Sequence, residues 1–282
     1  MADSTDKTQQ RQVTPEAKPR QTYSDSWFNT DITDGNFSYA DFKRGGAKKR
    51  RFVQVNFTGT FFEKSYFNHC EFDSCVFTGC RFDSVNFEGS VFSGCKFEYA
   101  VFDKTNIDEH VLVSEYPQAE NLRMRFARAM RVNFAQTGNA DGVNKAISIE
   151  LAATRLYLWN AWTSKATYYR KKYKGLARAK KTIEWLRFKI MDLIWGNGES
   201  PARLFMTFIA GILAVALLDF LRSPVMDIAS FQKSIANAPA IAFGFIVKGN
   251  HLSQIELVFI TIIRLILFGL FMAIVVRRYS RR

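Results

Sequence analysis

Large apolar side chains recur at every fifth residue through the first half of the chain. From Phe37 to Phe102, thirteen of the fourteen positions in this series are phenylalanine, and Ala47 is the exception. A helix repeats after about 3.6 residues and a strand after two, so neither explains a period of five. The pattern therefore predicts an internal structural repeat.

Small residues form a second series, two positions before each phenylalanine. Most of its members are Ala40, Val55, Thr60, Ser65, Cys70, Cys75, Cys80, Val85, Ser90, Cys95, Ala100 and Thr105. One small and one large inward side chain in each unit fill a narrow tube, while the polar residues between them face water.

The four cysteines, Cys70, Cys75, Cys80 and Cys95, all belong to the small series, interleaved with Phe72, Phe77 and Phe82. A metal or redox site is the alternative, but C-x-x-C spacing and nearby histidine pairs are missing from this stretch. A free cysteine behaves as a small buried apolar residue. The sequence therefore predicts packed, reduced thiols rather than metal ligands.

The units "CEFDS", "CVFTG", "CRFDS", "VNFEG" and "CKFEY" resemble the pentapeptide-repeat family. The resemblance implies a right-handed, four-sided β-helix over residues 35–115, with about four coils of four units each. It also implies that Cys75 and Cys95 are neighbours on adjacent coils. Some soluble members of the family mimic duplex DNA and bind topoisomerases, but that function expects a longer and more acidic rod.

The polar residues 1–34 lack an apolar signal sequence and are predicted to be a disordered arm. Residues 116–195 return to helical periodicity and are predicted to form a basic, amphipathic connector. Its segment "YYRKKYKGLARAKK", residues 168–181, fits a helix on an anionic membrane surface. A solvated basic helix packed on its neighbours fits equally well, and nucleic-acid binding is a weaker third alternative.

Two long apolar runs occupy the end of the chain, at residues 204–221 and 257–276. Each is long enough to cross a hydrocarbon core of about 30 Å. Each contains one charged residue, Asp219 in the first and Arg264 in the second. Residues 196–282 are therefore predicted to be a two-span membrane domain.

Charge is distributed unevenly and predicts the orientation of these spans. The net charge of +13 divides into −3 over residues 1–115 (14 basic against 17 acidic) and +16 over residues 116–282 (25 against 9). Because positive residues flank both spans outside the loop between them, both termini are expected in the cytoplasm. The expected location is a bacterial inner membrane.

The loop between the spans is itself apolar at residues 230–250. We expect a re-entrant pore loop over about 229–248, with a short helix from Ala229 to Ala238, a break at Pro239 and an extended return. Irregular backbone at membrane depth must be shielded by protein or line a water-filled cavity, so a homo-oligomer is expected.

The order of span, short helix, loop and span resembles the pore module of two-span potassium channels. "WGNGESPARLF" (195–205), "FARAMRVNFAQTGNADGVNKA" (126–146) and "FGLFMAIVVRRYSRR" (268–282) resemble segments of bacterial proteins that join such a module to pentapeptide repeats. The resemblance implies a tetramer. The filter candidates are Ala240, Ile241, Ala242, Phe243 and Gly244, where alanines replace the usual Thr and first Gly, so potassium selectivity is not expected.

Arg264 lies well inside the second span, where a charge faces a partner or water. It is predicted either to pair with Glu256 or Asp219, or to join a ring of arginines that lines a pore and favours anions.

These patterns favour an ion-channel-like membrane protein whose cytoplasmic β-helix senses or binds an unknown partner. The alternative is a non-conducting, membrane-anchored scaffold that displays the repeat. Enzymatic activity is not expected, since the chain has no G-x-x-x-x-G-K-[ST], H-E-x-x-H or G-x-S-x-G motif. No cofactor or nucleic-acid partner is expected.

Overall fold

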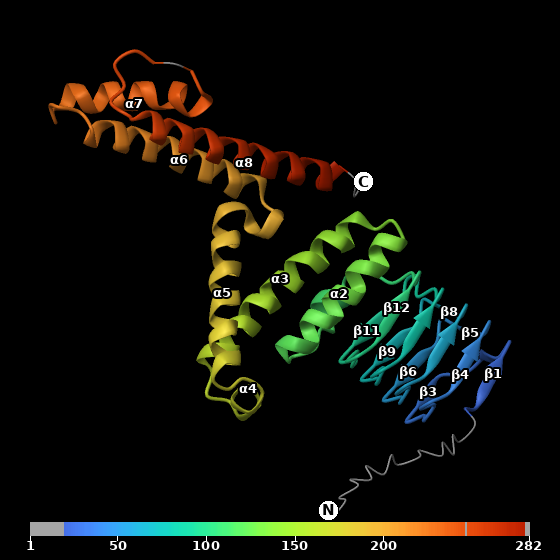
Figure 1. Ribbon diagram of the computed structural model, residues 1–282. Helices are drawn as coiled ribbons and strands as arrows, with labels where there is room; N and C mark the ends of the chain where they lie inside the picture. The colour runs from blue at the N-terminus through green and yellow to red at the C-terminus, as the bar shows by residue number, and fades with distance from the viewer. Residues whose placement is uncertain (1–19, 246, 280–282) are drawn as a thin grey trace, which may run out of the picture. The chain divides into compact units, whose positions relative to one another are not determined.

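The computed structural model describes residues 20–245 and 247–279, and it divides into two compact units. The first contains the residues up to 118 together with 125–137, and the second contains residues 119–124 and 138 onward. Figure 1 shows short strands in the first unit and helices in the second. Residues 1–19 of the predicted disordered arm, Ile246 and residues 280–282 lie outside the described residues.

Short parallel strands build the first unit as a β-solenoid. They are β1 (Thr22–Ser24), β2 (Trp27–Phe28), β3 (Ile32–Thr33), β4 (Asp41–Lys43), β5 (Gly46–Lys48), β6 (Arg51–Val53), β7 (Phe61–Glu63), β8 (Tyr66–Asn68), β9 (Glu71–Asp73), β10 (Arg81–Asp83), β11 (Val91–Ser93) and β12 (Val101–Asp103). They form sheets β1-β4-β7-β10-β12, β3-β6-β9-β11 and β2-β5-β8, and a column of single bridges from Asn36 to Lys96 forms a fourth side. The predicted four-sided solenoid of about four turns is confirmed.

The phenylalanines form ladders inside this solenoid because one coil takes twenty residues. Phe62 pairs in register with Phe82, for example, and their rings stack with centroids 5.2 Å apart and planes 10° from parallel. Phe57 and Phe77 stack at the same distance in a neighbouring ladder. Each such ring buries a large apolar area, so the ladders form the core of the unit.

The solenoid begins earlier than the sequence pattern predicts. Residues 22–33 already form β1 to β3, so the predicted boundary at residue 35 is wrong. Tyr23 pairs with Phe42 at a spacing of 19 residues, whereas Ile32 pairs with Phe52 at a spacing of 20. The first coil therefore has one residue fewer than the others, and the missing residue lies between Phe28 and Ile32. Because of this shift, the first coil does not follow the five-residue series.

Ala47, the exception in the phenylalanine series, marks a place where neighbouring coils approach closely. It pairs with Phe28 on one side and Phe67 on the other, and those two rings approach each other to 6.5 Å between centroids. A Cβ atom added at the adjacent Gly46 would lie 1.8 Å from the carbonyl oxygen of Tyr66. The small side chains here leave room for the flanking rings and the backbone.

Two helices close the carboxyl end of the solenoid, α1 (Val111–Ser114) and α2 (Glu120–Gln136). The Phe126 ring lies 5.9 Å from that of Phe97 and 6.2 Å from that of Phe102, so it continues the aromatic core beyond the last coil. The Glu115 side chain accepts a hydrogen bond from the buried backbone N–H of Cys95. Phe126 and Glu115 therefore cover aromatic rings and a backbone N–H at the end of the solenoid, where no further coil follows.

The connector in the second unit consists of three helices and one turn of 3₁₀ helix. They are α3 (Ala140–Thr163), α4 (Thr167–Lys172), α5 (Leu176–Trp195) and η1 (Gly196–Gly198). The sequence predicts helical periodicity over residues 116–195, and the structure divides this stretch into separate helices. The backbone becomes extended at Ser164 and turns through Gly175, whose φ is 49°.

The remaining helices are α6 (Pro201–Leu221), α7 (Ile228–Phe243) and α8 (Gln254–Tyr279). Ser200 caps α6 by accepting a hydrogen bond from the N–H of Arg203, with Pro201 in the first turn. Ser253 and Glu256 form a capping box at the start of α8. Helices α6 and α8 are long and apolar enough to cross a membrane.

Candidate functional site

The side chains with the most unusual surroundings lie among α6, α7 and α8. A buried carboxylate occupies the end of α6, and a guanidinium in the middle of α8 lies against the end of α7. Apolar side chains surround both, including a core cluster of Val215, Ala216, Ala238, Ile241 and Leu252. We treat this hairpin as the candidate functional site.

Asp219 is 1% exposed and connects three segments. The hydroxyl of Ser234 on α7 donates to its Oδ2 at 2.7 Å, and the backbone N–H of His251 donates to its Oδ1 at 2.7 Å. The His251 Nδ1 atom lies 3.5 Å from the same oxygen. A buried carboxylate needs such donors, and here they fasten α7 and the segment returning to α8 onto α6.

Helix α7 runs back along α6. Near its start, the Phe231 ring lies 5.3 Å from that of Phe220 at the end of α6. At its other end, the Phe243 ring lies 5.4 Å from that of Phe208, in the first half of α6. The two contacts are twelve residues apart on α6, which corresponds to about 18 Å of helix. The carboxyl end of α7 therefore lies beside the middle of the α6–α8 pair.

Arg264 lies at this end of α7, against Gly244. Gly244 ends the helix in the left-handed conformation, with φ of 87°. A Cβ atom placed there would be 1.7 Å from Nη1 of Arg264. A cation at a helix carboxyl end is favourable, because the last carbonyl groups carry partial negative charge. Glu256 and Asp219, the partners predicted for Arg264, instead contact Arg222 and the Ser234–His251 pair, respectively.

The five filter candidates do not form an extended strand. Ala240, Ile241, Ala242 and Phe243 are the last turn of α7, and Gly244 is its cap. The predicted break at Pro239 is wrong, because the helix continues through this proline. A proline inside a helix costs about 3 kcal/mol. Ala238, Ile241 and Ala242 are buried around it, and this packing offsets the lost hydrogen bond.

Next to the carboxyl end of α7, a groove of about 600 Å³ lies between α6 and α8. Its lining is apolar apart from one residue, Arg264, and includes Phe205, Phe243, Leu265 and Phe268. A charge that is this isolated among apolar side chains requires water or another polar surface. In the structure that polar surface includes the carboxyl end of α7 at Gly244.

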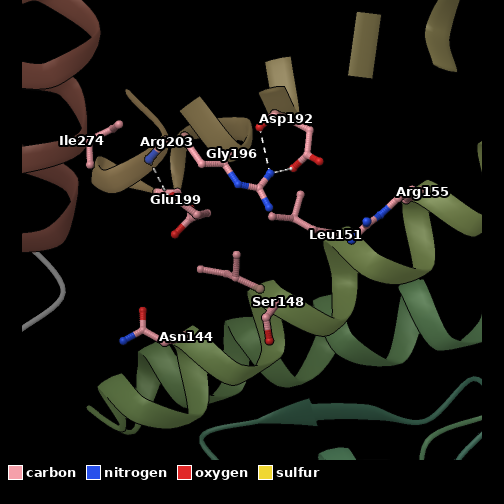
Figure 2. A pocket seen from close by; sticks show the side chains of 12 residues that line it. Asn144, Ser148, Leu151, Arg155, Asp192, Gly196, Glu199, Arg203 and Ile274 are labelled. Atoms are coloured by element: carbon pink, nitrogen blue, oxygen red, sulfur yellow. Dashed lines mark hydrogen bonds and ion pairs between the residues drawn. The ribbon is translucent and has the colours of Figure 1, made fainter. Parts of the chain in front are cut away.

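A second cavity, of about 480 Å³, lies where α3, α5 and the start of α6 meet. Figure 2 shows the Arg203 guanidinium reaching across to the side chain and carbonyl oxygen of Asp192, which fixes α5 against α6. Ser148 and Arg155 of α3 line the other side. The cavity is polar and open, and Arg203 is already paired in it.

The four cysteines are free and buried inside the solenoid. The Cys80 thiol donates to the carbonyl oxygen of Phe57 at 2.8 Å, and burial raises its pKa to about 12. The neighbouring Cys75 sulfur and burial both raise the pKa of Cys95. In the part of the chain that the structure describes, no group of three or more His, Cys, Asp or Glu side chains is placed to hold a metal ion.

Ser234 and His251 are parts of this site that sequence reasoning missed. Ser234 is a small polar residue in an apolar segment, and Asp219 is a charge at the end of an apolar run. Because buried polar groups are usually hydrogen-bonded, one polar residue in each of two apolar segments could have suggested that Ser234 and Asp219 form a pair. His251 contributes its backbone N–H, which any residue other than proline carries, so its identity gave no signal.

Comparison with known proteins identifies only the repeat. Residues 51–89 and 72–114 match family models described as pentapeptide repeats, and residues 51–114 are a pentapeptide-repeat domain. Neither match extends beyond Ser114, the last residue of α1. No curated protein matches the chain.

Two solved structures are similar to parts of it. One is QnrB1, a plasmid-mediated fluoroquinolone resistance protein, at 16% identity and a TM-score of 0.19, covering 32% of this chain and 54% of that one. The other is a pentapeptide repeat protein from the thylakoid lumen of Arabidopsis thaliana, at 17% identity and a TM-score of 0.16, covering 36% and 76%. The chain therefore spans only about half the length of QnrB1.

Proposed function

We propose that this chain is an ion-channel-like integral membrane protein. In this proposal α6 and α8 cross the bilayer, α7 is a re-entrant pore helix, and several copies surround a common axis. The pentapeptide-repeat domain is a cytoplasmic part that senses or binds a partner. The excess of basic residues outside the loop between the spans supports cytoplasmic termini and, in a bacterium, the inner membrane.

The position of the α7 carboxyl end carries this proposal. If α6 spans the bilayer, the contact between Phe243 and Phe208 places the end of α7 deep in the hydrocarbon region. The chain turns there with Phe243 and Phe245 exposed by 59% and 70%. Non-helical backbone at that depth persists only next to protein or water. A single hairpin provides neither, which supports an oligomer with the turn near its axis.

Arg264 suggests the selectivity of the path. It is the one charge in the groove below α7, and in a symmetric oligomer each copy contributes one. A ring of arginines raises the local concentration of anions and opposes cations. The helical conformation of Ala240 to Phe243 leaves no extended row of carbonyl groups of the kind that potassium filters use. The proposed path therefore favours anions.

Purified full-length protein in planar bilayers tests this function. We expect current whose reversal potential in a KCl gradient indicates anion preference. Arg264→Gln is expected to reduce that preference, whereas Arg222→Gln is a matched control, because Arg222 pairs with Glu256 at the ends of the spans. Absence of current under every gradient and voltage, from protein shown to be inserted, would refute the proposal.

A non-conducting anchor that displays the repeat domain is the second candidate function. The last turn of α7 favours it, because a helix that is closed by Gly244 presents few free carbonyl groups to an ion. The two functions differ in assembly as well as in current. Native mass spectrometry from nanodiscs is expected to show several copies for the channel, and single copies would favour the anchor.

A further inference from the structure

Helix α5 presents an apolar stripe that no described residue of its own unit covers. Its members follow steps of three and four residues: Leu176, Ala179, Ile183, Leu186, Ile190 and Leu193. Leu176 is 90% exposed and Leu193 is 78% exposed, and the three other large residues are exposed as well. This spacing places all six side chains along one face of a helix. We call this face the α5 stripe.

The opposite face of α5 is already occupied. The Trp185 ring lies 5.3 Å from that of Trp159 and 5.4 Å from that of Trp162, both on α3. Arg178 donates two hydrogen bonds to the carbonyl oxygen of Trp162. The fold of the connector therefore holds α5 by its aromatic side and leaves the α5 stripe pointing away from α3.

Basic residues flank the α5 stripe on both sides. Lys180 and Arg187 follow one edge and Lys189 the other, and all three are exposed. A stripe with this spacing is also typical of a coiled coil. Like charges along both edges oppose pairing with a second copy of the same helix, whereas they complement the phosphate groups of an anionic lipid surface.

The stripe continues onto α6. Ile190 and Leu193 share an open concavity of about 610 Å³ with Met206 of α6, and Lys189, Asp192 and Arg203 line its rim. Figure 1 shows α5 meeting the start of α6 at a steep angle rather than running along it. A helix that meets the start of a membrane span at a steep angle, with its apolar side facing the same concavity as the span, has the arrangement expected at a bilayer surface.

We propose that α5 is an interfacial helix that binds the anionic leaflet on the side where α6 begins. The α5 stripe lies at the boundary between headgroups and acyl chains, and Lys180, Arg187 and Lys189 contact phosphate groups. A phospholipid fills the corner between α5 and α6, with its chain along Met206. This inference rests on one part of the proposed function, that α6 and α8 span the bilayer, and it does not require conduction.

A matched pair of cysteine variants tests the position of α5. Ala179→Cys lies on the stripe and Ala177→Cys lies about 150° away from its centre, and both alanines are exposed. The full-length variants are labelled with an environment-sensitive fluorophore in nanodiscs, with wild type as the control for the native, buried thiols. Nitroxide lipids labelled near the headgroup are expected to quench residue 179 about twofold more than residue 177, since interfacial helices insert about 5–10 Å.

Lipid charge provides the second measurement. Removing the flanking charges by Lys180→Gln, Arg187→Gln and Lys189→Gln together is expected to reduce quenching at residue 179 in discs that contain phosphatidylglycerol. The same change is expected to have little effect in phosphatidylcholine discs, because the electrostatic attraction of these basic residues requires anionic lipid.

A label at Leu265→Cys, in the middle of α8, separates the two proposals. If residue 265 is quenched by nitroxides deep in the bilayer and residues 179 and 177 are equally unquenched, α5 does not lie on the membrane and only this inference fails. Crosslinking of residue 179 between two copies would also overturn it, in favour of a protein partner. If residue 265 is not quenched, the proposed membrane function fails as well.

Discussion

Asn133 closes the last coil of the solenoid by bonding both backbone groups of Thr105. The N–H of Thr105 donates to Asn133 Oδ1, and Asn133 Nδ2 donates to the carbonyl oxygen of Thr105, both at 2.8 Å. Asn133 is fully buried. Asn133 Nδ2 thus takes the place of the N–H that a further coil would supply, as the N–H of Asn106 does for Val85, and the same amide also accepts from the Thr105 N–H. The cap keeps the edge of the solenoid closed.

Replacing this amide should open the end of the repeat domain. Asn133→Ala leaves two backbone groups of Thr105 without partners, at a cost of about 1–3 kcal/mol each. We expect faster hydrogen exchange in peptides that cover residues 100–107 and a lower melting temperature. Gln136→Ala is the control, since Gln136 bonds Lys104 and Asp103 from an exposed position and its loss should cost less. Equal effects of the two changes would contradict this assignment.

Placing a phenylalanine at position 47, the one exception in the phenylalanine series, should destabilise the protein. Ala47→Phe introduces a ring where those of Phe28 and Phe67 already approach to 6.5 Å. Overpacking of this kind costs about 1–3 kcal/mol. Chemical denaturation followed by circular dichroism measures the change. Ser65→Cys, which exchanges two residue types that both occupy the small series, should be near neutral, and a more stable Ala47→Phe variant would refute the packing argument.

The contact between Gly244 and Arg264 can be separated into two contributions by a double-mutant cycle. Gly244→Ala is expected to lower the melting temperature, because its Cβ atom meets the guanidinium and because φ of 87° disfavours alanine. In an Arg264→Ala background the steric contribution disappears, and the backbone strain of about 1–3 kcal/mol remains. Gly269→Ala on α8 is the control, since a Cβ atom there meets nothing within 4 Å. Identical costs in both backgrounds would mean that the two residues do not interact.

The thiols should be unreactive until the solenoid unfolds. Because burial raises the pKa of Cys80 from 9.0 to about 12, its thiolate is scarce at pH 8 and Ellman's reagent should react only after denaturation. The raised pKa also makes stability depend on pH. The contribution of Cys80 is fully present below about pH 9, and it is lost as the pH rises toward about 12. Cys80→Ser should flatten this alkaline decline, and an unchanged decline would assign it to other groups.

The sequence predicts the solenoid well because its residues repeat the same surroundings. Every fifth position faces the same core, so a single rule covers Phe57, Phe77 and Phe97 alike. The rule fails at the first coil, where the step from Phe28 to Ile32 is four residues long. One missing residue leaves the fold intact but removes the coil from the series.

The hairpin was harder to predict because its features depend on contacts between distant segments. Pro239 is a local signal for the end of a helix, yet burial of Ala238 and Ile241 against α6 carries the helix beyond it. From the sequence, Asp219 and Glu256 are both plausible ion-pair partners for Arg264. Its actual neighbour, Gly244, has no charge and becomes visible only when α7 is folded back.

The Asn133 cap has a consequence for how this repeat domain varies in length. Because the cap bonds only the final coil, a unit of twenty residues inserted upstream would lengthen the rod by one strand spacing, about 4.8 Å, without altering the junction with the helices. A repeat domain that is capped in this way can change its length in equal increments while the helices that follow it stay the same.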